Sequence, residues 1–350
     1  MKNILLFFTL FAVCTGGSFA MSFKSSQKTH TSVYPTINFR NAVITDSAEQ
    51  NGITITKGYV LFRAFRTHFR IVGDLNSSKP PLLLLHGGPG STHNYFEVMD
   101  HLAAQTGRLL ISYDQLGCGE SFLENRPELW VADTWVDELD NLIKKLELKK
   151  IHILGQSWGG MLAITYLADR TQKGIVSVIL SSALSDSQLW GAEQHRMARQ
   201  LPPAEQQALA QAEQTNDYTS PQYLQAIGHY MQLHGSDQKY TDDAPECLRR
   251  KKRFGEESYL VAWGPNELTP LGTLAHWNYT EKLPRITVPA LIISGTEDLS
   301  TPTIAKTMAD KFPNATWELI EKCRHLCFVD MPEPYFKKLT SWLANTDNKK

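Results

Sequence analysis

The sequence has few cysteines, almost no net charge and no apolar run long enough to cross a membrane. Five cysteines in 350 residues are too few for a disulfide framework to hold the fold. The 35 basic and 36 acidic residues leave a formal net charge of −1, which gives no reason to expect nucleic acid or an anionic membrane as a partner. The one basic cluster, at residues 249–253, favours the solvated face of a helix over a binding patch. What remains is an ordinary globular composition, with 42% hydrophobic residues for a large core.

The first twenty residues have the features of a signal peptide. Lys2 supplies a positive charge, residues 4–13 are apolar, and Ser18-Phe19-Ala20 is a small-x-small cleavage site. An apolar run of about ten residues is too short to span a bilayer as a helix. We therefore expect residues 1–20 to be removed and the protein to be exported, periplasmic or secreted, without stable membrane insertion. Lipidation at Cys14 is an alternative, although the small residue usual just before a lipidated cysteine is absent.

The hydrophobic pattern predicts a sheet whose strands are spread along the chain. After residues 21–50, which we expect to form a polar irregular leader, residues 52–72 alternate apolar and polar side chains, a pattern typical of antiparallel strands. Further short strands are predicted at residues 82–85, 109–113, 151–154, 175–181, 290–294 and 316–320. Helical spacing separates several of them, for example at residues 134–146. Such alternation is typical of an α/β fold with a mostly parallel sheet and helices on both faces.

One long stretch interrupts this alternation. Residues 185–288 contain no long β-branched run, are helical in pattern at residues 205–213, and carry several tyrosines and tryptophans. We expect them to form a helical cap over the loop edge of the sheet. The core is then made of residues 51–184 and 289–345.

A candidate nucleophile follows the predicted strand at residues 151–154, in Gly155-Gln156-Ser157-Trp158-Gly159-Gly160. A strand, a very tight turn and a helix together present a serine as a nucleophile. Gly155 and Gly159 leave the room that the cramped backbone of Ser157 requires. The helix that follows directs its N-terminal amides at the serine, where an anion is stabilised. Gly-x-Ser-x-Gly alone is common in plain turns, but the strand and helix around it favour catalysis.

A serine hydroxyl needs a base to take its proton, and the base needs an acid that fixes its tautomer. When the serine turn comes early in such a sheet, the acid and base follow later strands in the order Ser, Asp, His. Asp298 follows residues 290–294, with Glu297 as its alternative, and His325 follows residues 316–320. Eleven histidines make chance matches easy, so position is what favours His325 over a surface histidine. We expect His152, within a strand, to be a packed or edge side chain.

The attack creates an oxyanion, which two backbone amides can stabilise. Trp158, directly after the serine, is expected to supply one amide. Gly88, in the loop His86-Gly87-Gly88-Pro89-Gly90 after the first buried strand, is the candidate for the other. The alternative for this loop is a simple glycine turn, which is less attractive beside a second glycine-rich loop and the serine turn.

Cleavage after residue 20 would leave four cysteines, Cys118, Cys247, Cys323 and Cys327. In an oxidising compartment they allow up to two disulfides, and the sequence leaves the pairing open. Cys323 and Cys327 flank His325, so a bond between them would stiffen the loop that carries it. A zinc site is the weaker alternative, because Cys-x-His-x-Cys places its ligands too close together without a second cluster. No metal site is predicted.

Several motifs occur in a fixed order along the chain. They are His86-Gly87-Gly88-Pro89-Gly90, Tyr113-Asp114-Gln115-Leu116-Gly117-Cys118-Gly119, Gly155-Gln156-Ser157-Trp158-Gly159-Gly160, Trp263-Gly264-Pro265-Asn266-Glu267-Leu268, Gly295-Thr296-Glu297-Asp298 and His325. Together they resemble the proline iminopeptidase family of α/β-hydrolases, over nearly the whole chain after residue 50. The resemblance implies an α/β-hydrolase fold and removal of an N-terminal residue, typically proline, from peptides. It also implies a triad of Ser157, Asp298 and His325, with Gly88 and Trp158 at the oxyanion hole.

An aminopeptidase must also hold the free α-amino group of its substrate, and a buried carboxylate is the physical means. The resemblance implies that Glu267 has this role, with a capping or surface glutamate as the alternative. Some relatives carry a second glutamate directly after the catalytic aspartate, where this chain has Leu299. The loss of that anion would weaken amine binding, shift it to a cap residue such as Glu256 or Glu257, or broaden specificity.

The sequence therefore predicts an exported serine aminopeptidase that releases an N-terminal residue, most often proline, from short peptides with a free N-terminus. The acyl-enzyme is hydrolysed by water, so no metal or organic cofactor is expected. A broader esterase or amidase with the same triad is the alternative, and Glu267 discriminates, since an esterase has no use for a carboxylate facing an amine. A non-catalytic binding protein on the same fold is a remote alternative, which the complete triad and oxyanion loops disfavour.

Overall fold

The computed structural model describes residues 37–236 and 242–347, all within a compact unit that spans Ser32–Lys350. The predicted signal peptide and residues 21–36 of the predicted leader lie outside the described residues. Among the helices of the described part, none combines the length and the apolar character that a membrane crossing requires.

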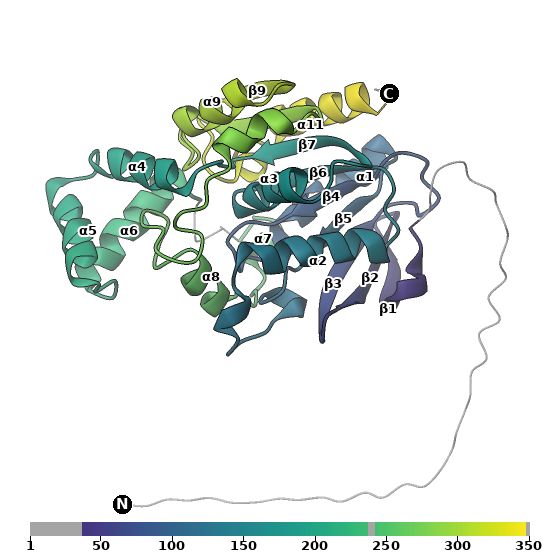
Figure 1. The fold of residues 1–350 in the computed structure, drawn as a ribbon, viewed down its shortest axis with the longest axis horizontal. Helices are drawn as coiled ribbons and strands as arrows, with labels where there is room; N and C mark the ends of the chain where they lie inside the picture. The colour runs from purple at the N-terminus through teal and green to yellow at the C-terminus, as the bar shows by residue number, and fades with distance from the viewer. Residues whose placement is uncertain (1–36, 237–241, 348–350) are drawn as a thin grey trace, which may run out of the picture. The chain divides into compact units, whose positions relative to one another are not determined.

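The described residues form a nine-stranded sheet with the strand order β1-β2-β3-β5-β4-β6-β7-β8-β9 (Figure 1). The first three strands are antiparallel to their neighbours, and β4 to β9 run parallel to one another and to β5. This confirms the predicted antiparallel start and mostly parallel sheet. The strand bounds are β1 Ala42–Gln50, β2 Ile53–Phe62, β3 Phe65–Val72, β4 Leu82–Leu85, β5 Leu110–Tyr113, β6 Ile151–Gln156, β7 Ile175–Ser181, β8 Ala290–Gly295 and β9 Ala315–Ile320.

The prediction of an irregular leader over residues 21–50 is wrong for residues 42–50, which form a strand. After a 3-10 turn, η1 (Phe39–Asn41), the chain forms β1, which pairs with β2 along its length. Nearly every residue of β1 is exposed, since it is the edge strand and neither face is covered. A strand without a buried face has no reason to alternate apolar and polar side chains, so its sequence carries no strand signal.

Helices cover both faces of the sheet, as predicted. In β4 the side chains alternate between two buried clusters: Leu83 and Leu85 belong to one, Leu82 and Leu84 to the other. The first cluster is completed by α2 (Ala132–Lys145), α3 (Trp158–Asp169) and α9 (Pro302–Lys311), and the second by α1 (His101–Thr106), α10 (Cys327–Asp330) and α11 (Pro332–Thr346). In Figure 1, α2 and α3 lie across the near face of the strands.

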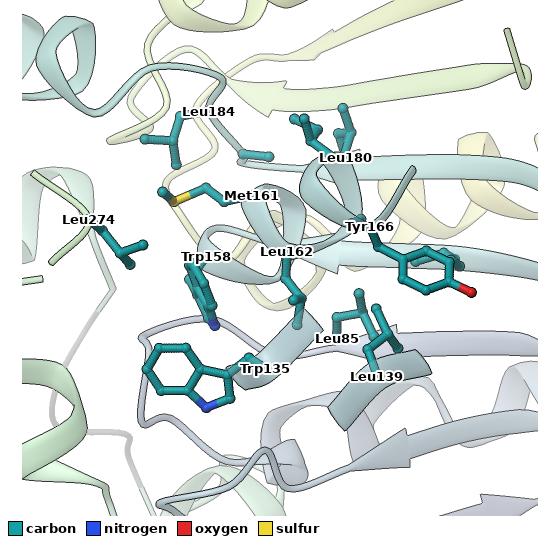
Figure 2. Close-up of a cluster of buried hydrophobic side chains, with 14 of the residues drawn as sticks. Leu85, Trp135, Leu139, Trp158, Met161, Leu162, Tyr166, Leu180, Leu184 and Leu274 are labelled. Atoms are coloured by element: carbon teal, nitrogen blue, oxygen red, sulfur yellow. The ribbon is translucent and has the colours of Figure 1, made fainter. Parts of the chain in front are cut away.

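The helix α3, which follows the candidate nucleophile, is buried in this core (Figure 2). Its first residue, Trp158, packs edge-on against Trp135 of α2, with 5.2 Å between ring centroids. The Trp158 indole Nε1 donates a hydrogen bond to Gln115 Oε1 at 2.8 Å. The start of α3 is therefore held by both packing and a buried hydrogen bond, which leaves little freedom to the turn before it.

Between β7 and β8 the chain forms the helical insertion, whose first helices are drawn at the left of Figure 1. Its helices are α4 Ser187–Ala198, α5 Pro203–Thr215, α6 Pro221–His234, α7 Glu246–Arg249, α8 Glu256–Ala262 and η5 Thr280–Arg285. The basic cluster at residues 249–253 is not the solvated helix face that we expected. Arg249 ends α7, and residues 250–255 form an irregular segment between α7 and α8. The remaining 3-10 turns are η2 His93–Met99, η3 Gly119–Ser121 and η4 Pro127–Leu129.

Candidate active site

Ser157 occupies the sharp turn between β6 and α3. Its backbone has φ 55° and ψ −122°, a conformation that a residue with a side chain rarely adopts. The Ser157 amide donates to the carbonyl of Ser181 on β7 at 3.0 Å, which ties the turn to the neighbouring strand. The strand–turn–helix context predicted for this serine is confirmed.

The glycines around Ser157 are required by close packing. A Cβ at Gly155 would collide with the Gly159 carbonyl oxygen, and a Cβ at Gly159 would collide with the carbonyl oxygen of Leu85. These obstacles are backbone atoms of a central strand and of the turn itself, so they cannot move aside as a flexible side chain could. Glycine at position 155 therefore lets the start of α3 lie close to β6, and glycine at position 159 lets it lie close to β4.

Asp298 and His325 come together from the loops after β8 and β9. The His325 ring nitrogen Nδ1 lies 2.8 Å from Asp298 Oδ1. Asp298 is 1% exposed, and its carboxylate accepts the backbone amides of Ser300 at 2.8 Å and Gly295 at 3.2 Å. The alternative Glu297 is exposed and points elsewhere, toward the hydroxyl of Thr296. A buried carboxylate on Nδ1 leaves Nε2 of His325 as the nitrogen available to exchange a proton.

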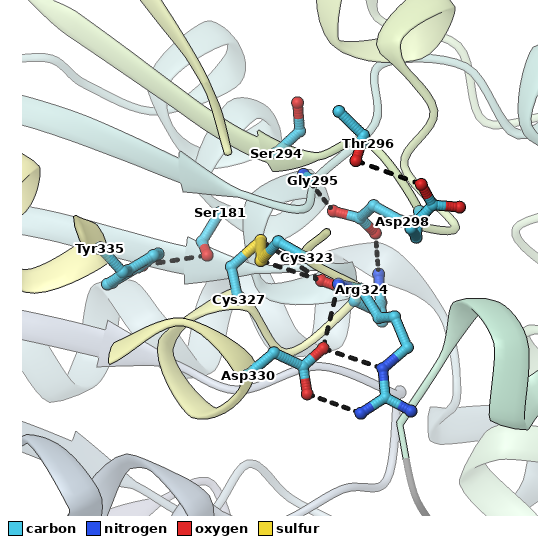
Figure 3. The surroundings of a disulfide bond; sticks show 12 residues. Ser181, Ser294, Gly295, Thr296, Asp298, Cys323, Arg324, Cys327, Asp330 and Tyr335 are labelled. Atoms are coloured by element: carbon cyan, nitrogen blue, oxygen red, sulfur yellow. Dashed lines mark hydrogen bonds and ion pairs between the residues drawn. A yellow bond between two sulfur atoms is a disulfide. The ribbon is translucent and has the colours of Figure 1, made fainter. Parts of the chain in front are cut away.

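A disulfide and an ion pair hold the loop between Cys323 and Cys327, which contains His325 (Figure 3). Cys323 and Cys327 form a disulfide across it, and their thiols are therefore not available as the alternative zinc ligands. Between them, the Arg324 guanidinium donates to Asp330 at 2.8 and 3.0 Å. Cys118 and Cys247 are free and buried.

The candidate oxyanion loop follows β4. Gly88 has φ 113°, and a Cβ there would come within 2.7 Å of the amide nitrogens of Gly90 and Ser91. The neighbouring Gly87 amide donates to the Tyr95 hydroxyl at 2.6 Å. Trp158 is the first residue of α3, so its amide has no carbonyl partner within the helix. Gly88 thus follows β4 and Trp158 begins α3, directly after the serine, and their role as the two oxyanion amides stays a prediction.

Ser157, Gly88 and His325 line one cavity of about 570 Å³ between the core and the cap. The cap contributes a set of aromatic and large apolar side chains to this cavity, which are Tyr218, Tyr223, Leu224, Ile227, Met231, Phe254 and Tyr259. A cavity of this size and lining suits a small organic ligand whose apolar part is enclosed by the cap. The tyrosines of the cap were noticed in the sequence, but no pattern assigned them to a cavity.

Glu267 contributes the one carboxylate among the described residues that line this cavity. Its Oε1 accepts a hydrogen bond from the Tyr259 hydroxyl at 2.8 Å, and its backbone carbonyl accepts from Trp190 Nε1 at 2.8 Å. Burial raises the pKa of Glu267, while the nearby His325 and the Tyr259 hydrogen bond act in the opposite direction. Such a carboxylate gains a partner when a cationic amine enters the cavity.

The alternative amine-binding residues lie outside the cavity. Glu256 is exposed, and Glu257 accepts from the Trp130 indole at 2.9 Å and from the Arg126 amide at 3.0 Å. Leu299 is fully buried, and its carbonyl accepts from Gln194 Nε2 at 2.7 Å. Of the three consequences considered for Leu299, a shift of amine binding to Glu256 or Glu257 has no support in this geometry, because neither residue lines the cavity and Glu257 bonds to the segment before α2.

Two buried groups of metal-ligand side chains occur in the described part of the chain: His68, His93 and Asp114, and His86, Asp114 and Cys118. Most of their ligand atoms already bond to one another or to the backbone, and His68 Nδ1 lies 3.4 Å from Asp114 Oδ2. Asp114 Oδ1 accepts from His93 Nδ1 at 2.7 Å, and Asp114 Oδ2 accepts from the Glu120 amide at 2.9 Å. His86 Nε2 accepts from the Gln115 amide at 3.0 Å. These groups fasten the loops after β4 and β5 together, and we assign them no metal.

His152 is packed, as expected for a histidine within a strand. It is fully buried in β6, with Nδ1 2.8 Å from the Ser177 hydroxyl and Nε2 3.0 Å from Asp347. Burial lowers its pKa, against the opposing effect of Asp347. It lies on β6 away from the serine turn and takes no part in the candidate site.

Comparison with known proteins gives the family. Residues 80–332 match the model of the alpha/beta hydrolase fold family. A proline iminopeptidase of Lactiplantibacillus plantarum is 53% identical over 286 residues, which are 82% of this chain and 99% of that protein. The chain belongs to the proline iminopeptidase family of α/β-hydrolases. It is therefore an enzyme, a serine hydrolase of that type.

Two solved structures agree with this placement. The crystal structure of a proline iminopeptidase of Mycobacterium smegmatis has a TM-score of 0.73 and 28% identity, covering 83% of this chain and 98% of that one. The crystal structure of VinJ has a TM-score of 0.76 and 32% identity over the same shares of the two chains. The α/β-hydrolase fold predicted from the motifs is thus confirmed by sequence and by structure.

Proposed function

We propose that this proline iminopeptidase family member is a serine aminopeptidase that releases an N-terminal residue, most often proline, from short peptides. The observation that carries the proposal is the position of Glu267, a carboxylate in the same cavity as Ser157 and His325. A hydrolase of neutral esters would gain nothing from a desolvated anion beside its nucleophile, whereas a free α-amino group would be bound by it. The names of the relatives support the same activity.

In the proposed reaction, Glu267 binds the ammonium of the first residue and so places the following carbonyl carbon at Ser157 Oγ. As Oγ forms its bond to that carbon, its proton passes to Nε2 of His325. Asp298, on Nδ1 of His325, stabilises the imidazolium that results. The carbonyl oxygen becomes an oxyanion, which the amides of Gly88 and Trp158 stabilise.

The second half of the reaction returns these groups to their starting state. His325 gives its proton to the departing amine of the second residue, and the C–N bond breaks to leave an ester on Ser157. Water then loses a proton to His325 and attacks the ester carbonyl, and the Ser157 oxygen leaves as a hydroxyl. The balance is one peptide bond and one water consumed, so the cycle needs no metal or organic cofactor.

The proposed binding mode also explains why the enzyme would remove a single residue from the N-terminus. The substrate ammonium is held at Glu267 within the cavity, so no residue can precede it, and the aromatic cap wall encloses the first side chain. A proline ring suits such a wall because it is compact, apolar and has no side-chain freedom to lose. Because Leu299 follows Asp298 in place of a second glutamate, the substrate ammonium has Glu267 as its one proposed anionic partner. We therefore expect peptides with other N-terminal residues to be hydrolysed too, but more slowly than those with proline.

Steady-state hydrolysis of proline arylamide tests this proposal. It is compared with alanine and leucine arylamides and a short-chain nitrophenyl ester, and Ser157→Ala serves as the blank. We expect proline arylamide to have the highest kcat/KM of the arylamides. Turnover of the ester without turnover of any arylamide would contradict the peptidase and support the esterase alternative.

Export of the enzyme is a second proposal, which rests on Lys2, the apolar residues 4–13 and Ser18-Phe19-Ala20. Mass spectrometry of the protein purified from its own cells would test it. A mature chain that begins at Met21, found in the periplasm or the medium, is the expected result. An uncleaved chain in the cytoplasm would contradict it.

A further inference from the structure

The cavity has one cationic side chain besides its histidine. Among the described residues that line it, Lys252 is the one lysine or arginine and Glu267 the one carboxylate. A cavity that offers one anion and one cation is complementary to a molecule that carries both charges. A short peptide at neutral pH is such a molecule, with an ammonium at one end and a carboxylate at the other.

The arginines of the basic cluster have other partners, and Lys251 is exposed. Arg250 forms ion pairs with Glu97 at 3.0 Å and with Glu246 at 2.6 Å. The Arg253 guanidinium lies 3.5 Å from the ring centroid of Phe122. Lys252 is half-buried, and no carboxylate of residues 37–236 or 242–347 forms an ion pair with it. It is therefore the one member of the cluster that both lines the cavity and has no carboxylate partner among the described residues.

The backbone next to Lys252 is fixed to the catalytic core rather than to the cap alone. The Gly119 amide donates to the Arg253 carbonyl at 2.8 Å, and the Gly255 amide donates to the Gly90 carbonyl at 2.8 Å. Gly90 ends the loop that contains the oxyanion candidate Gly88. Lys252 is thus held in a defined place relative to the reacting groups, which a binding residue requires.

The surroundings of the Lys252 ammonium favour an anionic ligand. Burial lowers its pKa, as does Arg250, while Cys247 and Glu97 raise it. A partly desolvated ammonium without a bonded carboxylate gains more from an incoming anion than a solvated surface lysine does.

We propose that Lys252 binds the C-terminal carboxylate of the substrate, which makes the enzyme selective for short peptides with a free C-terminus. This inference rests on the aminopeptidase activity proposed above. Glu267, Ser157 and Lys252 line the same cavity, so a peptide with its ammonium at Glu267 and its scissile carbonyl at Ser157 can place its C-terminal carboxylate at Lys252. An extended residue spans about 3.5 Å, and a cavity of about 570 Å³ therefore encloses only a few residues. Dipeptides and tripeptides are the expected substrates.

The test compares prolyl-alanine with prolyl-alaninamide, which differ only in the charge of the C-terminus. The quantity measured is the ratio of kcat/KM for the acid to kcat/KM for the amide. For the wild type we expect a ratio of roughly ten, the value of one charge-assisted hydrogen bond. Lys252→Met should bring the ratio close to one, through a higher KM for the acid. Lys252→Arg, which keeps the charge, should retain part of the preference.

Lys251→Met is the matched control, because Lys251 is the exposed neighbour and does not line the cavity. It removes the same charge from the same segment and should leave the wild-type ratio unchanged. A wild-type ratio near one, or the same ratio in Lys252→Met as in the wild type, would overturn the role of Lys252. If proline arylamide is still hydrolysed in that case, the aminopeptidase proposal stands; failure of all three proline substrates would instead contradict that proposal.

Discussion

Asp298 Oδ1 lies 2.8 Å from Nδ1 of His325, although the two residues are 27 positions apart in the chain. Each follows a parallel strand, β8 or β9, and parallel neighbours bring their carboxyl ends to the same edge of a sheet. Ser157 follows β6 at that edge. The strand order therefore brings three side chains from three distant segments to one edge of the sheet. The loops after the strands then fix their final positions.

Asp298→Asn should lower kcat for proline arylamide by roughly a thousandfold or more. An asparagine of the same shape can donate where the carboxylate accepts, so it favours the wrong tautomer of His325 and no longer stabilises the imidazolium. Substrate binding does not involve Asp298, so KM should change little. Glu297→Gln is the control, since Glu297 is exposed, and it should keep wild-type kcat. Equal losses in the two variants would contradict the assignment.

Gly159→Ala should destabilise the enzyme by more than about 3 kcal/mol or prevent folding, because the new Cβ collides with the Leu85 carbonyl of the central strand. Gly228→Ala is the matched control. Gly228 lies within α6, where a Cβ would have nothing within 4 Å. Alanine there should stabilise by about 0.5 kcal/mol or more. Denaturant unfolding measures both, and similar stabilities for the two variants would contradict the packing described for the turn.

The Cys323–Cys327 disulfide should be detected as a peptide two hydrogens lighter than its reduced form after digestion without reductant. Its loop is short, with a sequence separation of 4, so the loop-closure model gives a stabilisation of about 2 kcal/mol. Replacing both cysteines by serine should lower the free energy of unfolding by that order. Because His325 lies within the loop, kcat should fall severalfold. Alkylation of both thiols in the native, unreduced protein would rule the bond out.

Glu138 gives a stability prediction that depends on pH. Its carboxylate accepts from the Thr67 hydroxyl at 2.5 Å and from the Leu116 amide at 2.9 Å, and burial raises its pKa from 4.5 to about 7. Between these two values the folded protein holds a proton that the unfolded chain has lost, so this group's contribution to stability falls as the pH rises through that range.

Glu138→Gln removes this titration. The free energy of unfolding of the variant, relative to the wild type, should therefore shift in favour of the variant by about 3 kcal/mol between about pH 5 and about pH 8. Urea unfolding at several pH values measures it. A difference between the two proteins that does not depend on pH would show that Glu138 is ionised in the fold throughout.

The parts of the site that the sequence predicted are those that depend on local geometry or on strand order. Ser157, Gly88 and Trp158 lie in turns whose glycines are visible in the sequence, and Asp298 and His325 follow the last two strands of the pattern. Glu267 came from the family resemblance, since a single glutamate in a cap carries no local signal.

The parts that the sequence missed depend on packing between distant segments. The edge strand β1 has no buried face and so no alternation. Glu256 and Glu257 were considered as additional amine partners in the cap, and only the path of the cap shows that Glu257 bonds to Trp130 instead. Lys252 was one of five basic residues, and its place in the cavity follows from backbone ties of residues 253 and 255 to the core.

The most direct test of the account is the dependence of activity on a free α-amine in the wild type and in Glu267→Gln. The measurement is kcat/KM for proline arylamide and for N-acetylproline arylamide. The wild type should hydrolyse only the free amine at an appreciable rate, and Glu267→Gln should lose about a hundredfold toward it, the worth of a partly buried ion pair.

Burial raises the pKa of Glu267, so the contribution of this group to stability falls as the pH rises above the ordinary pKa of a glutamate, and the glutamine variant should be at least as stable as the wild type at neutral pH. Lost activity in a stable Glu267→Gln enzyme is therefore the predicted result. A wild type that accepts the acetylated substrate equally well, or a Glu267→Gln variant with unchanged kcat/KM, would contradict the central claim that this carboxylate selects the substrate.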